Sequence, residues 1–533
     1  MKVLKEGAPQ ETLQVAVSTN ASRWHRFTLL WLVFCGGVAV MGMEMTASQL
    51  IAPYFGSTIS VWTSLIGLVL VFLTTGYYLG GALADRRPSR GLLGTIVLTA
   101  GAAMIVMPLV SVPVLQMAWQ LTPSAGLLGG SLVGTFILLS VPNILLGCIC
   151  PFAMKLSILD LGRTGRASGN IYAISAIGSV IGTFLPVLVT IEAFGVRRSL
   201  MIFGALLIVA AILLLSRLRY TPATAVMLLL AVPLTPILPT KGLIAERESA
   251  YNYLQVVEAG NAKVLIVDWG AFSFYAPGEF RTGQYYDYLL LAPLMRAQAP
   301  TESLHRALVI GLGAGTISKQ ATQAYGPIGI DGVEIDPAIV ELGRTYFDMH
   351  EPNLRVHETD GRAFLAASRE PYDWVVVDAY QGSEIPSHLV TKEFFRLLKS
   401  RMTSDGVLSV NVAWWEPSDT ELLQRLVVTV KTAFPTVCAI TGISRQSGAV
   451  LLAGGEEASP DRIIENARIV GHQGLMEIAD ELGDNQPPQL EVPEGLTGMP
   501  LTDDRGLLNK VVDRMYLKAR KDAYEREREA LGL

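Results

Sequence analysis

Three acidic residues occupy positions from which they could act on a bound small molecule. Glu334, Asp360 and Asp378 each come at or just past the end of a short run that is typical of a strand. The carboxyl ends of parallel strands meet at one edge of an open α/β sheet, where ligands bind. We therefore expect Glu334 to accept ribose hydroxyls, Asp360 to hold an adenine amino group, and Asp378 to act as a base. Any one acid alone could instead be a helix cap or a turn residue.

A glycine loop precedes the first of these acids. Gly311, Gly313 and Gly315 follow directly on the apolar run Ala307–Ile310, and Glu334 comes about 20 residues later. The pattern predicts a strand, a glycine loop, a helix and a second strand that ends in the acid. Glycines let the backbone turn tightly and approach a ligand. A tight turn in a purely structural unit is the alternative, but the strand before the loop and the acid after it favour a nucleotide or adenosyl ligand.

The elements around these residues predict an α/β Rossmann-like domain of the class I methyltransferase type. Strand–helix alternation continues to about Gly454, which indicates a doubly wound sheet. Long helices are expected at Tyr285–Ala297 and Ser459–Ala479. A small antiparallel sheet is expected ahead of them, with strands at 253–257, 262–268 and 272–275.

The first half of the chain has a different composition. Half of the 533 residues are hydrophobic and 17% are charged, and nearly all charge lies before Arg26 or after Lys241. Between them lie apolar runs close to the length that spans a bilayer, about 20 residues. The predicted spans are 27–43, 61–84, 92–114, 127–150, 171–191, 200–215 and 223–238. The predicted division is a tail at 1–25, a multi-pass membrane domain at 26–240, a soluble domain at 246–508 and a charged C-terminal helix at 509–533.

The distribution of Lys and Arg between the spans predicts a cytoplasmic N-terminus in a cell (inner) membrane. Seven spans would then place the soluble domain outside, away from an adenosyl donor made in the cytoplasm. If the proline-rich seventh segment is re-entrant or interfacial, the soluble domain returns to the cytoplasm. We favour the cytoplasmic side for this domain. The loop Gly80–Arg90 resembles the loop between the second and third spans of major facilitator transporters, and six spans would be half of such a protein. A basic loop that only sets topology explains it equally well.

Charge and composition narrow the partners. The formal net charge is −5, which argues against nucleic acid. No Cys/His cluster has the spacing of metal ligands, so we expect no metal. The expected partners at this point are the lipid bilayer and an adenosyl-type ligand, and a homodimer is compatible with the sequence.

The soluble half, from about Glu246 to Leu508, resembles the polyamine aminopropyltransferases, the spermidine synthases. Membrane-fused members are a recognised subgroup, and the chain resembles them along its full length. The matching motifs are Glu248–Asn252, Tyr285–Asp287, the glycine loop, Val333–Pro337, Asp360–Gly361, Tyr372–Asp378, Pro386 and Leu501–Arg505.

The resemblance implies a role for each matching residue. Asp378 would take the proton from the acceptor, and Tyr286, Tyr380 and Gln381 would contact it. The adenosyl ligand would contact Asn252 (where the family usually has Gln), Gly311, Gly313, Gly315, Glu334, Asp360, Gly361 and Pro386. The implied reaction moves an aminopropyl group from decarboxylated S-adenosylmethionine to an amine such as putrescine, giving spermidine and methylthioadenosine, with no permanently bound cofactor.

Two departures from the family pattern keep other functions open. Ala314 stands where an acid grips the donor's amine, and Gln381 replaces a second acid after Asp378. Burying an ammonium group without a partner costs several kcal/mol. A methyltransferase that uses intact S-adenosylmethionine is therefore an alternative. A transporter or sensor for polyamines or adenosyl metabolites, whose soluble domain binds without turnover, is another.

Overall fold

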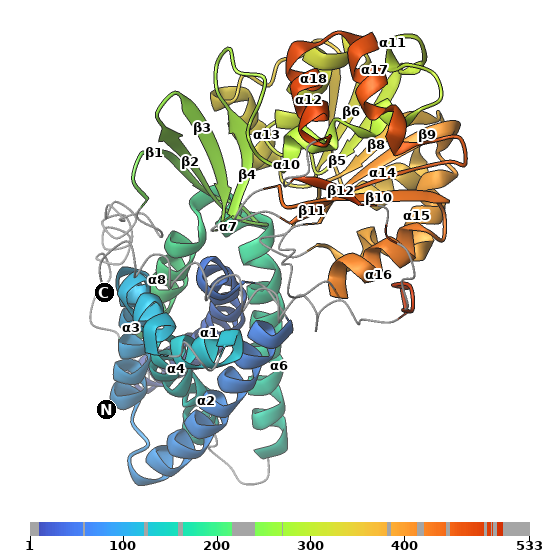
Figure 1. Ribbon diagram of the computed structural model, residues 1–533. Coiled ribbons are helices and arrows are strands. Elements are labelled where there is room, and N and C mark those ends of the chain that lie inside the picture. Colours follow the sequence, from blue (N-terminus) through green and yellow to red (C-terminus); the bar gives the residue numbers. More distant parts are fainter. Residues whose placement is uncertain are drawn as a thin grey trace, which may run out of the picture. The chain divides into compact units, whose positions relative to one another are not determined.

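The computed structural model divides the chain into two compact units, 1–238 and 239–533 (Figure 1). The described residues are 10–56, 59–121, 126–157, 164–215, 240–268, 270–380, 385–412, 421–443, 448–483, 488–491, 493 and 498–504. The predicted seventh span, the predicted C-terminal helix and Gln381 lie outside them.

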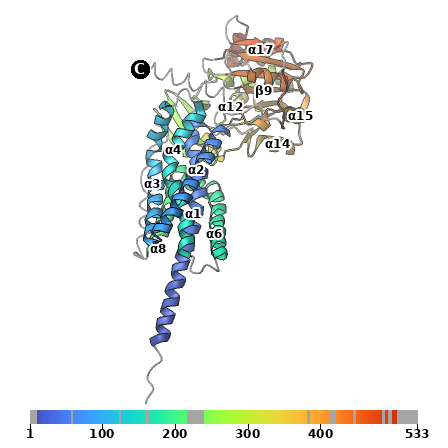
Figure 2. The same ribbon diagram turned by 90° about the horizontal axis from the view of Figure 1, so that it is seen from below.

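The first unit is helical throughout its described part, and Figure 2 shows α1 as its longest helix. Six stretches are long and apolar enough to cross a membrane, and each overlaps one of the first six predicted spans. The helices are α1 (Gln10–Phe55), α2 (Ile59–Arg86), α3 (Arg90–Leu121), α4 (Gly126–Gly147), α5 (Ile149–Ser157), α6 (Thr164–Leu185), the π-helix η2 (Pro186–Thr190), α7 (Ile191–Phe194) and α8 (Val196–Leu215).

Glycines let the helix backbones of this unit touch. A Cβ at Gly178 of α6 would lie 2.2 Å from the carbonyl oxygen of Phe34 in α1, and one at Gly76 of α2 would lie 2.2 Å from that of Ile144 in α4. Small residues are the usual means of close helix packing in a bilayer, where the hydrophobic effect does not drive helices together. Glycine at these two positions therefore allows the close packing of α1 with α6 and of α2 with α4.

The second unit begins with a four-stranded antiparallel sheet in the order β1-β2-β3-β4. Its inward face, with Leu254, Val256 and Leu265, forms an apolar cluster with Ile339 and Leu342 of the helix α13. The strands are β1 (Leu243–Glu248), β2 (Tyr253–Ala259), β3 (Ala262–Val267) and β4 (Gly270–Tyr275). The small sheet is thus packed against the helix that follows Glu334 in the larger α/β unit.

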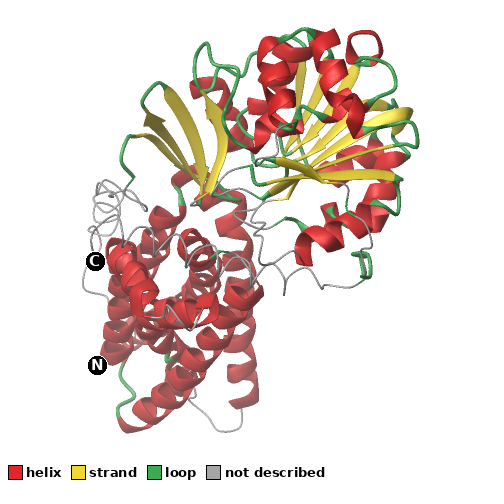
Figure 3. Cartoon of the chain, viewed as in Figure 1, coloured by secondary structure: helices red, strands yellow, loops and turns green. Residues whose placement is uncertain are grey.

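The main sheet has eight strands in the order β12-β10-β11-β9-β8-β5-β6-β7. Figure 3 shows its strands in yellow with helices around them. The five strands from β9 to β7 are parallel, and β11, β10 and β12 are antiparallel. The strands are β5 (Arg306–Ile310), β6 (Gly329–Glu334), β7 (Leu354–Glu358), β8 (Tyr372–Val377), β9 (Met402–Val412), β10 (Thr436–Thr441), β11 (Ala449–Gly454) and β12 (Gln489–Glu491). The connecting helices include α12 (Thr316–Tyr325), α13 (Pro337–Tyr346), α14 (Gly361–Ala367), α15 (Lys392–Lys399) and α16 (Glu421–Val430).

The sheet is buried between two apolar clusters, one against each face. Alternate residues of β8 divide between them: Val375 and Val377 pack in one, Trp374 and Val376 in the other. A strand buried on both sides reads as a continuous apolar run, as β8 does from Trp374 to Val377. The predicted Rossmann-like, methyltransferase-type fold is confirmed.

Two predicted helices are wrong in extent. The helix expected at 285–297 is a short helix, α10 (Tyr285–Leu289), followed by the 3₁₀ turn η3 (Ala292–Met295), since Pro293 has no amide to continue an α-helix. The helix expected at 459–479 is two helices, α17 (Ile463–Val470) and α18 (Gln473–Glu481). Gly471, with φ of 76°, ends the first in a left-handed conformation.

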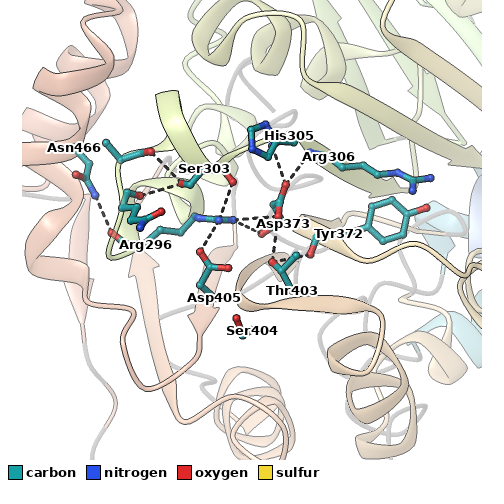
Figure 4. A network of polar contacts seen from close by, with 12 residues as sticks. Arg296, Ser303, His305, Arg306, Tyr372, Asp373, Thr403, Ser404, Asp405 and Asn466 are labelled. Atoms are coloured by element: carbon teal, nitrogen blue, oxygen red, sulfur yellow. Dashed lines mark hydrogen bonds and ion pairs between the residues drawn. The ribbon is translucent and has the colours of Figure 1, made fainter.

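A buried polar network secures the edge of the sheet where β8 begins (Figure 4). The Arg296 guanidinium, 2% exposed, donates to Asp405 at 2.6 Å, to the Ser303 carbonyl at 2.9 Å and to the Asp373 carbonyl at 3.2 Å. Thr403 donates to the Asp373 carboxylate at 3.2 Å. Asp373 is near the start of β8 and Asp378 is just past its end, so this network supports the sheet from the edge opposite the three acids.

Candidate active site

The glycine loop is shaped by its backbone. Gly311, Gly313 and Gly315 have φ of 87°, 57° and 90°, which residues with a side chain rarely adopt. A Cβ at Gly311 would lie 2.3 Å from the carbonyl oxygen of Asp378. Glycine at 311 therefore lets the end of β5 lie directly against the end of β8, which places Asp378 beside the loop.

Glu334 lies at the rim of the same loop. Its carboxylate accepts from the Gly313 amide at 2.9 Å and from the Asp336 amide at 3.1 Å. Burial raises the pKa of Glu334 to about 7, although these amide hydrogen bonds oppose the shift. A carboxylate offers about four acceptor positions, so these amide contacts leave room to accept a hydrogen bond from a ligand hydroxyl.

Asn252 joins the small sheet to this rim. Its Nδ2 donates to Asp336 at 3.0 Å, and its buried Oδ1 has no hydrogen-bond partner. Asp336 also accepts from Ser249 Oγ at 2.6 Å and caps α13 through the Ala338 amide at 3.0 Å. A buried acceptor without a donor is costly, so Asn252 Oδ1 is suited to accept a hydrogen bond from a ligand.

Asp360 caps a helix and also contacts a histidine. One oxygen accepts from the Ala363 amide at the start of α14 at 2.8 Å, and the other lies 2.9 Å from Nε2 of His388. Partial burial raises the pKa of Asp360, but these hydrogen bonds outweigh it and leave the pKa below its usual value. Pro386 precedes the 3₁₀ turn η4 (Ser387–Leu389) that carries His388. Gly361 packs on Ile310, where a Cβ would lie 2.3 Å from that side chain.

Asp378 is held by two donors from other elements. Asn411 Nδ2, on β9, donates to its Oδ1 at 2.7 Å, and the Tyr285 hydroxyl, on α10, donates to its Oδ2 at 3.2 Å. Burial raises the pKa of Asp378 to about 7, the two hydrogen bonds oppose that shift, and the charge of Glu334 adds to it. The arrangement gives an oriented carboxylate that changes protonation near neutral pH, as a general base requires.

Three tyrosines lie close to Asp378: Tyr286 and Tyr380, which were predicted to contact the acceptor, and Tyr285, for which no role was predicted. Tyr285 contacts the carboxylate, while the predicted Tyr286 packs against the Tyr285 ring with centroids 4.1 Å apart and is buried. Tyr380 donates its hydroxyl to the Asn411 carbonyl at 2.9 Å. Sequence reasoning did not find Tyr285, Asn411 or His388. A signal for Asn411 existed, since it is a polar residue in the mostly apolar run Val407–Val412.

The C-terminal motif docks beside Asp360. Arg362, on α14, donates to both oxygens of Asp503 at 2.8 and 2.7 Å. Leu501 is tied down by its amide, which donates to Thr429 at 2.9 Å, and by its carbonyl, which accepts from the Lys392 amide at 2.9 Å. Residues 501–504 thus connect α14 with α15 and α16.

Comparison with known proteins identifies this unit. Residues 285–444 match the family model described as Spermine/spermidine synthase domain, and this stretch contains Glu334, Asp360 and Asp378. The second unit belongs to the spermine/spermidine synthase family. The match begins at Tyr285, the residue that donates to Asp378, and ends three residues past β10.

Curated relatives agree with this assignment. The synthase domain is 36% identical over 195 residues to a probable polyamine aminopropyl transferase of Bifidobacterium longum, covering 36% of this chain and 42% of that one. It is 31% identical over 179 residues to a polyamine aminopropyltransferase of Vibrio vulnificus, and the match covers 32% of this chain and 58% of that protein. An N-terminal histidine N-methyltransferase of Emericella nidulans is 37% identical over 137 residues, and the match covers 24% of this chain and 23% of that protein. The chain spans about half the length of the aminopropyltransferases it matches.

The synthase domain has an apolar group at one position where an acid was expected. The Ala314 side chain is 1% exposed and lies in the cluster formed with Leu254, Leu342 and Phe347. The Ala314 amide donates to Ser273 Oγ at 2.8 Å, which holds the loop against β4. Position 314 therefore offers no charge to an amine and serves to pack the loop on the small sheet.

Proposed function

We propose that the chain transfers an aminopropyl group from decarboxylated S-adenosylmethionine to an amine, with Asp378 as the proton acceptor. The observation that carries this proposal is the environment of Asp378. Asn411 and Tyr285 orient a buried carboxylate whose pKa is about 7, and Gly311 brings it against the loop whose other rim is Glu334. The match to the spermine/spermidine synthase family supports the reaction class.

The reaction depends more on aligning the acceptor nitrogen with the carbon beside the sulfonium than on activating either reactant. Glu334, Asp360 and Asn252 would hold the adenosyl part, which leaves the carbon beside the sulfonium facing Asp378. The acceptor nitrogen attacks that carbon as Asp378 takes its proton, the new C–N bond forms, and the C–S electron pair stays on sulfur to give methylthioadenosine. Sulfonium is already a good leaving group, so holding the two reactants in line supplies most of the rate.

The pKa of Asp378 fixes the direction of the pH dependence. Only the ionised carboxylate can accept a proton, so activity should rise as the pH increases through about 7. The raised pKa of Asp378 also makes its contribution to folding stability depend on pH, and this contribution falls as the pH rises. Because the folded-state pKa is raised above the usual value for an aspartate, the contribution of Asp378 to stability is greatest below that usual value. It is lost as the pH rises through about 7.

Purified chain supplied with decarboxylated donor and putrescine tests this function. We expect methylthioadenosine and an aminopropylated amine in equal amounts. Asp480→Asn, an exposed change outside the site, serves as the matched control for Asp378→Asn. Failure to release methylthioadenosine from the decarboxylated donor with any amine would contradict the proposal.

A methyltransferase is the second candidate. Two observations favour it: Ala314 offers no partner for the donor's amine, and one relative is named an N-terminal histidine N-methyltransferase. Intact S-adenosylmethionine would then give S-adenosylhomocysteine, which chromatography separates from methylthioadenosine. Binding of either donor without formation of any product would instead support the hypothesis that the chain is a sensor or transporter.

We also propose that residues 26–240 anchor the synthase domain, residues 246–508, at the cytoplasmic face of the membrane. Within the described part of the chain, six helices are long and apolar enough to cross, and an even number of spans returns a chain to the side of its N-terminus. Asp85 and Lys155 form an ion pair at 2.7 Å, which supports placing these two predicted cytoplasmic loops on one side. Labelling of introduced cysteines in intact cells tests this: reagents that cannot cross the membrane should leave residue 370 unlabelled.

A further inference from the structure

A histidine contacts the carboxylate that would hold the adenine amino group. His388 Nε2 lies 2.9 Å from Asp360 Oδ2, while Asp360 Oδ1 accepts from the Ala363 amide at 2.8 Å. Partial burial raises the pKa of Asp360, but its hydrogen bonds hold the pKa below the usual value, so the carboxylate is ionised at neutral pH. An ionised carboxylate only accepts hydrogen bonds, so Nε2 of His388 carries the proton that lies between the two side chains.

The backbone of His388 is anchored independently of its side chain. Arg362 Nη1 donates to the His388 carbonyl at 3.0 Å, and the same guanidinium donates to both oxygens of Asp503. The next two residues, Leu389 and Val390, are buried in the apolar cluster on one face of the sheet. The position of the turn η4 therefore does not depend on the imidazole, and a change of this side chain leaves these contacts in place.

Both side chains of the pair are accessible from solvent. The Asp360 side chain is 35% exposed and the His388 side chain is 46% exposed. A carboxylate offers about four acceptor positions, and the hydrogen bonds from Ala363 and His388 leave room for a donor on a ligand. A carboxylate held at both oxygens keeps one orientation, so less conformational freedom is lost when a ligand binds to it.

We propose that His388 is a positioning residue for adenine recognition: it holds the Asp360 carboxylate in the orientation that accepts the 6-amino group of the adenosyl ligand. This inference rests on the adenosyl site of the proposed function and names a residue that sets its selectivity for a 6-aminopurine. Because His388 acts through Asp360, its contribution appears only when the purine carries a donor at position 6. A histidine that only stabilised the fold would affect every purine ligand alike.

Calorimetric binding of two ligands to the full chain tests this role. The ligands are methylthioadenosine and the 5′-methylthio derivative of purine riboside, which has hydrogen in place of the 6-amino group. We expect His388→Ala to weaken the binding of methylthioadenosine about threefold to fivefold, the scale of a partly exposed charged pair. The same variant should bind the purine derivative as tightly as the unmodified chain does. His388→Gln, whose amide NH₂ can donate in place of Nε2, should recover most of the lost affinity.

His305→Ala is the matched control. His305 is exposed and lies in the network of Figure 4, at the opposite edge of the sheet, where its amide donates to Asp373. Loss of its side chain should change neither affinity. Equal losses for the two ligands in His388→Ala, or no loss for methylthioadenosine, would overturn the inference and leave the proposed function standing. If the unmodified chain binds neither ligand, the adenosyl site of the proposed function is wrong, and the inference with it.

Discussion

Removing the Asn411 side chain tests how the protein sets its proposed base. Asn411 Nδ2 donates to Asp378 Oδ1 at 2.7 Å in a buried position, so this hydrogen bond stabilises the ionised carboxylate. A hydrogen bond to a charged group contributes about 1.5–3 kcal/mol, and one pKa unit corresponds to 1.36 kcal/mol. In Asn411→Leu, which keeps a side chain of similar size, the pKa of Asp378 should therefore rise by about one to two units.

Tyr285→Phe removes the second hydrogen bond to Asp378 and should have a smaller effect than Asn411→Leu. The Tyr285 hydroxyl donates to Asp378 at the longer distance of 3.2 Å. The expected rise in the pKa of Asp378 in Tyr285→Phe is therefore below about one unit. The assay is the pH dependence of kcat/KM for methylthioadenosine release, whose rising limb should lie near pH 7 in the unmodified chain. Adenosyl binding and thermal unfolding show that each variant is folded. A limb that stays in place in both variants would refute the view that these two residues tune Asp378.

Three further changes have defined outcomes. Glu334→Gln should weaken methylthioadenosine binding about tenfold in calorimetry, because an amide offers one acceptor oxygen instead of two. Gly311→Ala should lower both Tm and kcat, since φ is 87° and the new Cβ would meet Asp378; unchanged kcat would show that the close approach is dispensable. Asp405→Ala should reduce the free energy of unfolding in urea by about 1–3 kcal/mol by removing a partner of buried Arg296. Its KM for the donor should not change, because this network lies at the opposite edge of the sheet.

The local features of the site could be predicted from sequence. A glycine loop between two strands and an acid about 20 residues on are constrained by neighbours in the chain. Asp378 could be located because the apolar run Trp374–Val377 of β8 ends just before it. These features depend on periodicity and spacing, which the sequence displays directly.

Contacts between distant segments could not be predicted in the same way. Asn411 reaches Asp378 because β8 and β9 are parallel neighbours with Val377 opposite Val410, and neither the strand order nor the register is visible in the sequence. Tyr285 rather than Tyr286 meets Asp378 because α10 presents the first tyrosine to the sheet edge. His388 approaches Asp360 only through the turn that follows Pro386.

A single-turnover comparison of Asp378→Asn with the unmodified chain tests the central claim most directly. Both proteins are saturated with decarboxylated donor, mixed with amine, and followed by methylthioadenosine release, while calorimetry measures adenosyl binding. We expect Asp378→Asn to keep adenosyl binding and to lower the rate of turnover by a factor of at least 100, within the usual contribution of a general base. Equal rates for the two proteins would contradict the assignment of Asp378 as the proton acceptor.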